Sequence, residues 1–391
     1  MKSGKMFWTI LLCFLFILVS MGWLMMENNA SFDLKAKLKQ WVGRTPTQAV
    51  KTNPPEMNSA NIESPNGIKI DGTVHTTLYR DNFVLQAQEG IRCINRNGDV
   101  LWSSNMTMQN PIIQATAKYL LLCDRDSKEA NVQVDGKVLY TVKTEQPITH
   151  AKINENGMLA VVTAEKGYKG KVSVFDNSGQ QIYQWFSGDN YIIDVDVSND
   201  SKALAVCTAD ASKGVVAAGV LFFHLDQDKP YVTEMVDDTL PVQIKCYQDG
   251  GVVLLGDNGV YGFTLYDKKR FKYSFEGREV LTFDMQSQAV ITVALKEGIG
   301  ASGVSSAVEM IDRKGSKKGR FEVKGELKQI DVQGTTIAAN CQSDIYLINA
   351  QGKEVAKKYT WSKDVRTFAL MPNRREVMLS GAGLIEFVSL R

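Results

Sequence analysis

Carboxylate and basic side chains recur at matching places in short apolar segments that lie far apart in this chain. The matching places hold His150, Lys152, Asp194, Asp196, Asp284 and Asp331. Gathered in one site, the aspartates could bind a hard cation through their oxygens or act as a paired acid and base on a polysaccharide. Alternatively, polar groups on neighbouring strands satisfy the hydrogen bonds of the main chain and of one another. We favour this second interpretation, because repetition itself aligns such residues and no EF-hand-like loop, histidine-rich cluster or nucleophile motif accompanies them.

These six residues belong to a repeated segment with the pattern apolar, two variable residues, small or apolar, variable, apolar. The copies begin at Val74, Ile112, Ile148, Ile192, Val242, Val280, Leu327 and Val365. They are spaced by 36 to 50 residues, and each is followed by a second apolar run and then by a turn phrase or its remnant. Four short strands in each unit of about 40 residues are typical of a β-propeller blade. The sequence therefore predicts an all-β, eight-bladed β-propeller over residues 67–391, with the six polar residues on the innermost strands that line its channel.

The turn phrase predicts how each blade ends. In FDNSGQQIYQW, residues 175–185, the turn at Asn177, Ser178 and Gly179 supplies the backbone angles of a hairpin between the third and outermost strands. The eighth unit stops after its third strand, LIEFVSL, and therefore lacks an outermost strand. The segment GIKI, residues 67–70, precedes the first unit and belongs to no other blade. We expect GIKI to complete the last blade and so to remove an open sheet edge.

The best copies of the turn phrase, NRNGDVLW and DNSGQQIYQW, resemble the quinoprotein-like propeller repeat. Quinoprotein dehydrogenases hold pyrroloquinoline quinone and calcium in this type of ring, so the resemblance implies an enzyme as one alternative. The chain departs from their pattern, because it has no adjacent cysteine pair and keeps the glycine and tryptophan signatures in only two or three units. Since a shared fold does not imply a shared function, we expect no bound cofactor.

An apolar segment near the N-terminus indicates a membrane anchor. After a tail of residues 1–5, Met6 to Met26 form an uncharged run of 21 residues, long enough for a transmembrane helix. A cleavable signal peptide has a shorter apolar core. Two basic residues, Lys2 and Lys5, lie directly before the run, whereas the ten residues after Met26 contain one, Lys35. This distribution favours a cytoplasmic N-terminus. We therefore expect a single-pass protein of the cell membrane with an extracytoplasmic propeller. A propeller that faces the cytoplasm stays open, because further basic residues follow the span.

Residues 27–66 read as a connector between the span and the propeller. Residues 31–43 place apolar side chains at helical spacing, which is compatible with an amphipathic segment, and the following stretch is rich in proline and polar residues. A membrane span, a proline-rich tether and a propeller in this order resemble an uncharacterised family of anchored propeller proteins from anaerobic Gram-positive bacteria. That resemblance implies only a domain of unknown function.

Composition and loops indicate the kind of partner. The net charge of +2, from 45 basic and 43 acidic residues, gives no basic field for nucleic acid. Three loops between second and third strands, which contain AEKGYKGK, ADASKGVVAAG and GIGASGVSS, should project from one face of the ring. Loops on a rigid scaffold commonly carry binding residues. The candidate partner residues on them are Tyr168, Lys169, Lys213, Ile299 and Ser302.

The preferred interpretation is a binding or scaffold module without catalytic activity, whose partner is a protein or a component of the cell envelope. The alternative is an enzyme with a site in the channel, either a quinone-dependent oxidoreductase or a carbohydrate-active enzyme. The cysteines outside the span lie singly in apolar runs, so we expect them to fill the core.

Overall fold

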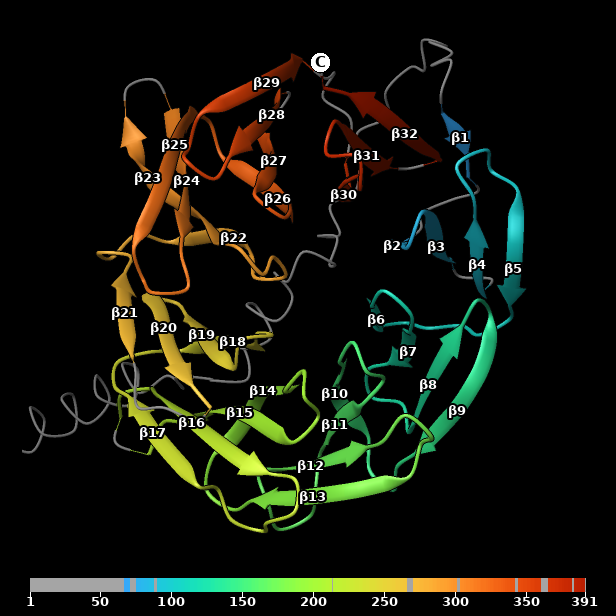
Figure 1. Cartoon of the computed structure of the whole chain (residues 1–391), viewed down its shortest axis with the longest axis vertical. Helices are drawn as coiled ribbons and strands as arrows, with labels where there is room; N and C mark the ends of the chain where they lie inside the picture. Colours follow the sequence, from blue (N-terminus) through green and yellow to red (C-terminus); the bar gives the residue numbers. More distant parts are fainter. Residues whose placement is uncertain are drawn as a thin grey trace, which may run out of the picture. The chain divides into compact units, whose positions relative to one another are not determined.

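The propeller consists of eight four-stranded antiparallel sheets arranged as blades around a central axis (Figure 1). The computed structural model describes residues 67–70, 75–87, 90–212, 214–265, 270–300, 303–341, 344–359, 365–381 and 383–390. We number the blades along the chain, from blade 1, which begins with β2, to blade 8, which begins with β30. The predicted fold and blade count are confirmed.

Each blade runs outward from the axis in chain order. The innermost strands are β2 (His75–Tyr79), β6 (Pro111–Ala115), β10 (Ile148–Ile153), β14 (Tyr191–Val197), β18 (Pro241–Cys246), β22 (Val280–Asp284), β26 (Leu327–Gln333) and β30 (Thr367–Leu370). The second strands are β3 (Asn82–Ala87), β7 (Leu120–Asp124), β11 (Leu159–Thr163), β15 (Ala203–Asp210), β19 (Gly251–Gly256), β23 (Ile291–Gly300), β27 (Thr336–Cys341) and β31 (Glu376–Gly381).

The third strands are mostly buried, whereas the outermost strands, such as β9 and β17, alternate between more and less exposed side chains, as expected for strands with one solvated face. The third strands are β4 (Gly90–Ile94), β8 (Glu129–Val134), β12 (Gly170–Phe175), β16 (Ala217–His224), β20 (Gly259–Thr264), β24 (Gly303–Ile311), β28 (Asp344–Asn349) and β32 (Leu384–Ser389). The outermost strands are β5 (Val100–Ser104), β9 (Lys137–Lys143), β13 (Gln181–Ser187), β17 (Val232–Val236), β21 (Phe271–Ser274), β25 (Lys317–Lys324), β29 (Glu354–Tyr359) and, for blade 8, β1 (Ile68–Lys69).

The N-terminal strand closes the ring, as predicted. Strand β1 pairs antiparallel with β32, with Ile68 opposite Ile385 and Lys69 opposite Leu384. Ile68 and Ile70 also pack on a hydrophobic cluster formed by blades 1 and 8. The first and last segments of the propeller therefore share one sheet, which leaves blade 8 with a fourth strand.

The turn phrase repeats because it joins neighbouring blades. Gly136 adopts a φ of +78°, and a Cβ there would lie 2.5 Å from the Trp102 ring of the preceding blade. Gly179, with a φ of +83°, meets Tyr140 of its preceding blade in the same way, at 2.8 Å. These two turn glycines thus give an outer aromatic residue of the previous blade a surface without a side chain, and Gly315 does the same for Phe271. The glycine and the aromatic residue of the phrase pack across the interface between two blades.

This packing predicts a destabilising substitution at Gly179. We expect Gly179→Ala to lower the free energy of unfolding by about 2–3 kcal/mol, because positive-φ strain and overpacking against Tyr140 add together. Gly167→Ala is the matched control, since Gly167 has a φ of +84° but nothing within 4 Å of the added Cβ. The control should lose only about 1 kcal/mol of backbone strain. Urea unfolding of both variants measures the difference, and equal losses would contradict the packing role.

The three loops that separate second and third strands differ from expectation in one case. Residues 164–169, 211–212 and 214–216 lie between strands, as predicted. The segment Gly298–Ser306 was predicted to be an exposed loop, and this prediction is wrong. Gly298, Ile299 and Gly300 pair with Ser305, Val304 and Gly303, so the glycine-rich segment continues the β23–β24 hairpin.

No helix long and apolar enough to span a membrane occurs in the part of the chain that the structure describes. The predicted span at residues 6–26, the tail before it and the connector at 27–66 lie outside the described residues.

Candidate functional site

Polar side chains near the axis form hydrogen bonds from one blade to the next. In most cases a side chain from one inner strand bonds the main chain of the following blade. These contacts, in order around the ring, are Tyr79 Oη to Lys118 O (2.6 Å), Ile153 N to Gln114 Oε1 (2.9 Å), Asn154 Nδ2 to Ser198 O (3.0 Å), Cys246 N to Asp196 Oδ2 (2.7 Å), Tyr247 Oη to Met285 O (3.0 Å), Val332 N to Asp284 Oδ2 (3.1 Å), Leu370 N to Asp331 Oδ2 (2.6 Å) and Thr76 Oγ1 to Ser380 Oγ (3.0 Å).

His150, Lys152 and Asp194 meet between blades 3 and 4. The Lys152 Nζ lies 3.0 Å from Asp194 Oδ2 and donates to Ile244 O at 2.7 Å, and His150 Nε2 lies 2.7 Å from Asp194 Oδ1. Asp194 and Lys152 are only 4% and 7% exposed. Burial alone would raise the pKa of Asp194, but the Lys152 ammonium and the His150 hydrogen bond hold it well below its usual value. Lys152 and Asp194 therefore form a buried ion pair, with the less buried His150 hydrogen bonded to Asp194. The bond from Lys152 to Ile244 O extends the contact to blade 5.

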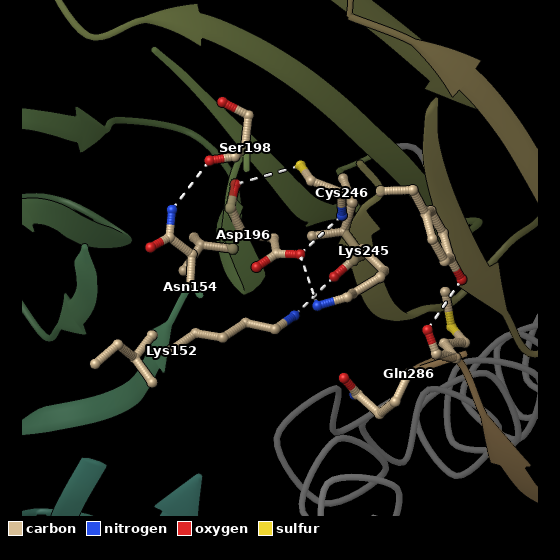
Figure 2. A network of polar contacts seen from close by, with 12 residues as sticks. Lys152, Asn154, Asp196, Ser198, Lys245, Cys246 and Gln286 are labelled. Carbon is tan, nitrogen blue, oxygen red and sulfur yellow. Dashed lines mark hydrogen bonds and ion pairs between the residues drawn. The ribbon is translucent and has the colours of Figure 1, made fainter. Parts of the chain in front are cut away.

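Asp196, two residues after Asp194 on β14, also links two blades. Its Oδ2 accepts from Cys246 N at 2.7 Å and lies 3.6 Å from Lys245 Nζ. Figure 2 shows this carboxylate between Lys245 and the main chain of Cys246, with Asn154 bonded to the adjoining strand at Ser198. Asp196 thus ties blade 4 to blade 5.

Asp284 and Asp331 approach each other between blades 6 and 7. Burial, together with the neighbouring charge of Asp284, raises the pKa of Asp331 to about 7. Burial also raises the pKa of Asp284, although main-chain donors from Gln286 and Val332 oppose the shift. Because each buried carboxyl group shifts the pKa of the other, the pair can share a proton.

The raised pKa of Asp331 predicts a pH dependence of stability. Between about pH 4 and pH 7 the folded chain keeps a proton that the unfolded chain has lost, so the stabilisation is complete below pH 4 and decreases as the pH rises to 7. In Asp331→Asn this decrease, roughly 4 kcal/mol for a pKa raised from about 4 to about 7, should disappear. The variant should be the more stable protein at pH 8, because the amide still accepts from Leu370 N. Urea unfolding from pH 4 to pH 8 measures how the free energy of unfolding changes with pH in the parent chain and in Asp331→Asn. The same change in both proteins would contradict the shared proton.

The predicted channel residues therefore form two separate groups. Asp194 and Asp196 lie with basic partners, and Asp284 and Asp331 lie with each other. Within the described ranges, no three or more His, Cys, Asp or Glu residues are placed to hold one metal ion. The sequence did not identify Asn154, Tyr79 or Tyr247 as members of the same bonding pattern, although each ends or follows an inner strand.

A buried charge in blade 6 escaped the sequence analysis. Glu309 is fully buried, and its Oε1 lies 2.9 Å from Arg278 Nη1 and 2.6 Å from Arg320 Nη1. Tyr273 Oη donates to its Oε2 at 2.7 Å. Burial would raise the pKa of Glu309, but these donors lower it. The alternation of charged and apolar residues on adjacent strands was the available signal, because it places Glu309 beside Arg320.

An exposed aromatic and basic cluster lies on the loop side of blades 3 and 4. Tyr168 is 48% exposed, and its ring centroid lies 5.0 Å from that of Phe186. Lys171 Nζ lies 5.5 Å from the Phe186 ring, and Lys169 Nζ lies 4.9 Å from the Tyr191 ring. We call Tyr168, Lys169, Lys171, Phe186 and Tyr191 the aromatic–lysine surface. The sequence identified two of its members and missed the three that come from β12, β13 and β14.

The other candidate loop residues are not placed. Lys213 and Ser302 lie outside the described residues, and Ile299 belongs to β23 with a side chain that is not described. The five cysteines from Cys93 to Cys341 are buried and unpaired, as expected of core residues. Burial raises the pKa of Cys93 to about 11 and that of Cys123 to about 12, so these thiols stay protonated at neutral pH.

Comparison with known proteins supports the fold. The model of a family of unknown function, DUF5711, matches residues 55–390. Among solved structures the chain is similar to BamB from Moraxella catarrhalis, with a TM-score of 0.51 and 14% identity over 82% of this chain and 95% of that one. It is also similar to the Cps50 (Swd1) β-propeller domain of Myceliophteria thermophila, with a TM-score of 0.51 and 11% identity over 83% of this chain and 98% of that one. No curated protein matches. At these identities the likeness concerns the fold alone.

Proposed function

We propose that this chain, which belongs to the DUF5711 family of unknown function, is a membrane-anchored β-propeller that acts as a binding or scaffold module outside the cytoplasm. The observation that carries the proposal is the bonding of the inner strands. The carboxylates near the axis accept main-chain N–H groups of the next blade, so their role is to hold the ring together. A rigid ring of this kind is a suitable support for binding loops.

The aromatic–lysine surface is the proposed contact region. The exposed Tyr168 and Tyr191 rings, with the half-buried Phe186 beside Tyr168, give large contact areas at low entropic cost, and aromatic residues often dominate binding energies. Two lysines beside the rings would favour an acidic partner. The partner we propose is therefore a protein or a component of the cell envelope that presents apolar and acidic groups together.

The membrane anchor rests on the sequence. The uncharged run at residues 6–26 is long enough to cross a bilayer, and Lys2 and Lys5 before it favour a cytoplasmic N-terminus. To test this orientation, Ser59→Cys is treated in intact cells with a membrane-impermeant maleimide, in a Cys13→Ala background. Labelling without lysis supports the extracytoplasmic propeller. Labelling only after lysis contradicts it and directs the search to cytoplasmic complexes.

The contact region is tested by site-specific crosslinking. A photoreactive residue in place of Tyr168 should form a defined adduct in cells, whereas the same residue at Val138, which is 57% exposed on β9, should not. Adding Lys169→Glu and Lys171→Glu should reduce the Tyr168 adduct by roughly tenfold, since losing two charges at a contact costs about 1–2 kcal/mol. Equal adducts at both sites, or an adduct that ignores the charge changes, would rule out this surface.

A channel enzyme is the second candidate, because Asp331 has the raised pKa that acid–base catalysts often have. This candidate predicts that a substrate or cofactor is retained by the purified protein and lost in Asp331→Asn. The binding module predicts that Asp331→Asn leaves the Tyr168 adduct unchanged. The two measurements separate the candidates.

A further inference from the structure

Four large apolar side chains are exposed on one face of blades 3 and 4, which are neighbours in the ring (Figure 1). On this face the innermost and third strands begin and the outermost strands end, because neighbouring strands of a blade are antiparallel. The four side chains lie at or near these strand ends and are Tyr168 (48% exposed), Tyr191 (38%), Val215 (55%) and Met235 (46%). Exposed apolar groups that share one face of a folded domain often mark an interaction site.

The blade 3 half of this face is basic. Lys169 and Lys171 contact aromatic rings, and neither forms an ion pair with any residue that the structure describes. The charged residues of the segment 165–171 and of the turn before β14 are Glu165, Lys166, Lys169, Lys171 and Asp189. Three lysines and two carboxylates give this half a net charge of +1. The half is therefore suited to an acidic partner.

The blade 4 half of the same face is acidic. Asp237 and Asp238 are exposed and directly follow β17, and Asp210 ends β15. The main-chain nitrogen of Thr239 donates to Val216 O at 3.0 Å, so the two exposed carboxylates lie beside the segment that carries Val215. Within the described part of the chain, neither Asp237 nor Asp238 forms an ion pair. Blade 4 thus presents apolar and acidic groups together, which are the features expected of a partner for the aromatic–lysine surface.

The two halves are complementary in charge, but they lie side by side and face the same way on one chain. They can therefore meet only between two copies. A two-fold axis that lies in the plane of the contact, along the boundary of blades 3 and 4, places blade 3 of each copy opposite blade 4 of the other. Every contact then forms twice, as in other symmetric dimers. Apolar residues form the centre and opposite charges the rim, which is the usual arrangement of a protein interface.

We propose that the partner of the aromatic–lysine surface is a second copy of this chain, in a two-fold dimer formed by blades 3 and 4. Lys169 and Lys171 of one copy face Asp237 and Asp238 of the other. The inference rests on the proposed function, because it identifies the occupant of the same contact region. It holds on either side of the membrane, since both copies have the same orientation.

Photocrosslinking from position 168 in the full-length protein tests the occupant. The adduct formed in cells should contain two chains of 43.4 kDa each, and the peptide linked to position 168 should include Val215 or Met235 of the second copy. Coexpression of a tagged copy shows that both chains are the same protein. An adduct with a different protein, or with a peptide of another blade, overturns the dimer but keeps Tyr168 as a contact site. If position 168 forms no adduct, the proposed contact region itself is wrong.

Paired charge reversals test the symmetry of the dimer. One variant combines Lys169→Glu with Lys171→Glu, and the other combines Asp237→Lys with Asp238→Asn. Asparagine is chosen at position 238 because the backbone φ there is +50°, which asparagine tolerates. Expressed alone, each variant places like charges opposite each other, so the two-chain adduct should fall by at least about tenfold. Expressed together, the two variants should restore the adduct to within about twofold, because both reciprocal contacts again join opposite charges.

Lys137→Glu, at the exposed start of β9 in blade 2, is the control for a change of charge elsewhere on the ring. The control should leave the two-chain adduct unchanged. Loss of the adduct when the two charge-reversed variants are expressed together would overturn the two-fold arrangement. An adduct that keeps its yield in each variant expressed alone would overturn it as well.

Discussion

Removing residues 1–71 is expected to lower the free energy of unfolding by at least about 3 kcal/mol relative to removing residues 1–60, because only the longer deletion takes away β1. The lost strand carries the pairs of Ile68 with Ile385 and of Lys69 with Leu384, together with the bond from Ile70 N to Gly383 O. Ile68 and Ile70 also leave the cluster between blades 1 and 8. Deleting them uncovers apolar surface on both blades and opens a sheet edge.

Urea unfolding of the two fragments, followed by tryptophan fluorescence, measures this difference. The shorter deletion is the control for losing the membrane span and most of the connector. The longer deletion should also give a lower midpoint at an almost unchanged slope, because the two fragments expose nearly the same surface on unfolding. Equal midpoints would mean that β1 is dispensable and that the ring is closed by the inner-strand contact of Thr76 with Ser380.

Lys152→Met is expected to lower the free energy of unfolding by about 3–5 kcal/mol, because it leaves the buried Asp194 carboxylate without its main charge partner. Burial alone would lower the pKa of Lys152, but Asp194 and Asp196 raise it above the usual value, so the ammonium stays charged in the folded chain. The same substitution also removes the bond from Lys152 Nζ to Ile244 O. Two blade interfaces are therefore weakened by one change.

Lys245→Met is the matched control, since the Lys245 ammonium lies 3.6 Å from Asp196 and is more exposed. The control should lose less than about 1 kcal/mol. The double variant Lys152→Met with Asp194→Asn should regain part of the loss, because no uncompensated charge remains in the interface. Thermal and urea unfolding at pH 7 measure the stability of all three variants. Similar losses of unfolding free energy in Lys152→Met and Lys245→Met would contradict a buried ion pair.

The pH profile gives an independent check on this pair. The pKa of Asp194 is lower in the folded chain than in the unfolded chain, so its stabilisation is complete above about pH 4 and is lost as the pH falls further. Asp331 has the opposite sign, because its raised pKa gives stabilisation that decreases between about pH 4 and pH 7. The Asp194→Asn and Asp331→Asn variants should therefore flatten different parts of the profile.

The glycine-rich segment at 298–306 shows where pattern reading fails. Glycine and serine favour turns, so the segment was predicted to be a loop. The structure continues β23 and β24 through it with a shift of register between Lys296 and Gly298. Pairing across the hairpin overrode the local preference, because residues 298–300 find partners in residues 303–305. The residue types within one segment do not show which other segment it will pair with.

The sequence by itself determined the number of blades, the turns between third and outermost strands, and the strand that closes the ring. These features follow from alternation with a period of two, from glycine at positive φ and from a count of strands, all of which are local. Only the tertiary structure decided that Lys152 meets Asp194, that Asp284 meets Asp331, and that Tyr168 lies beside Phe186 and Lys169 beside Tyr191. The stagger and twist between neighbouring blades select these pairs, and that geometry arises from packing of whole sheets, which no spacing along the chain specifies.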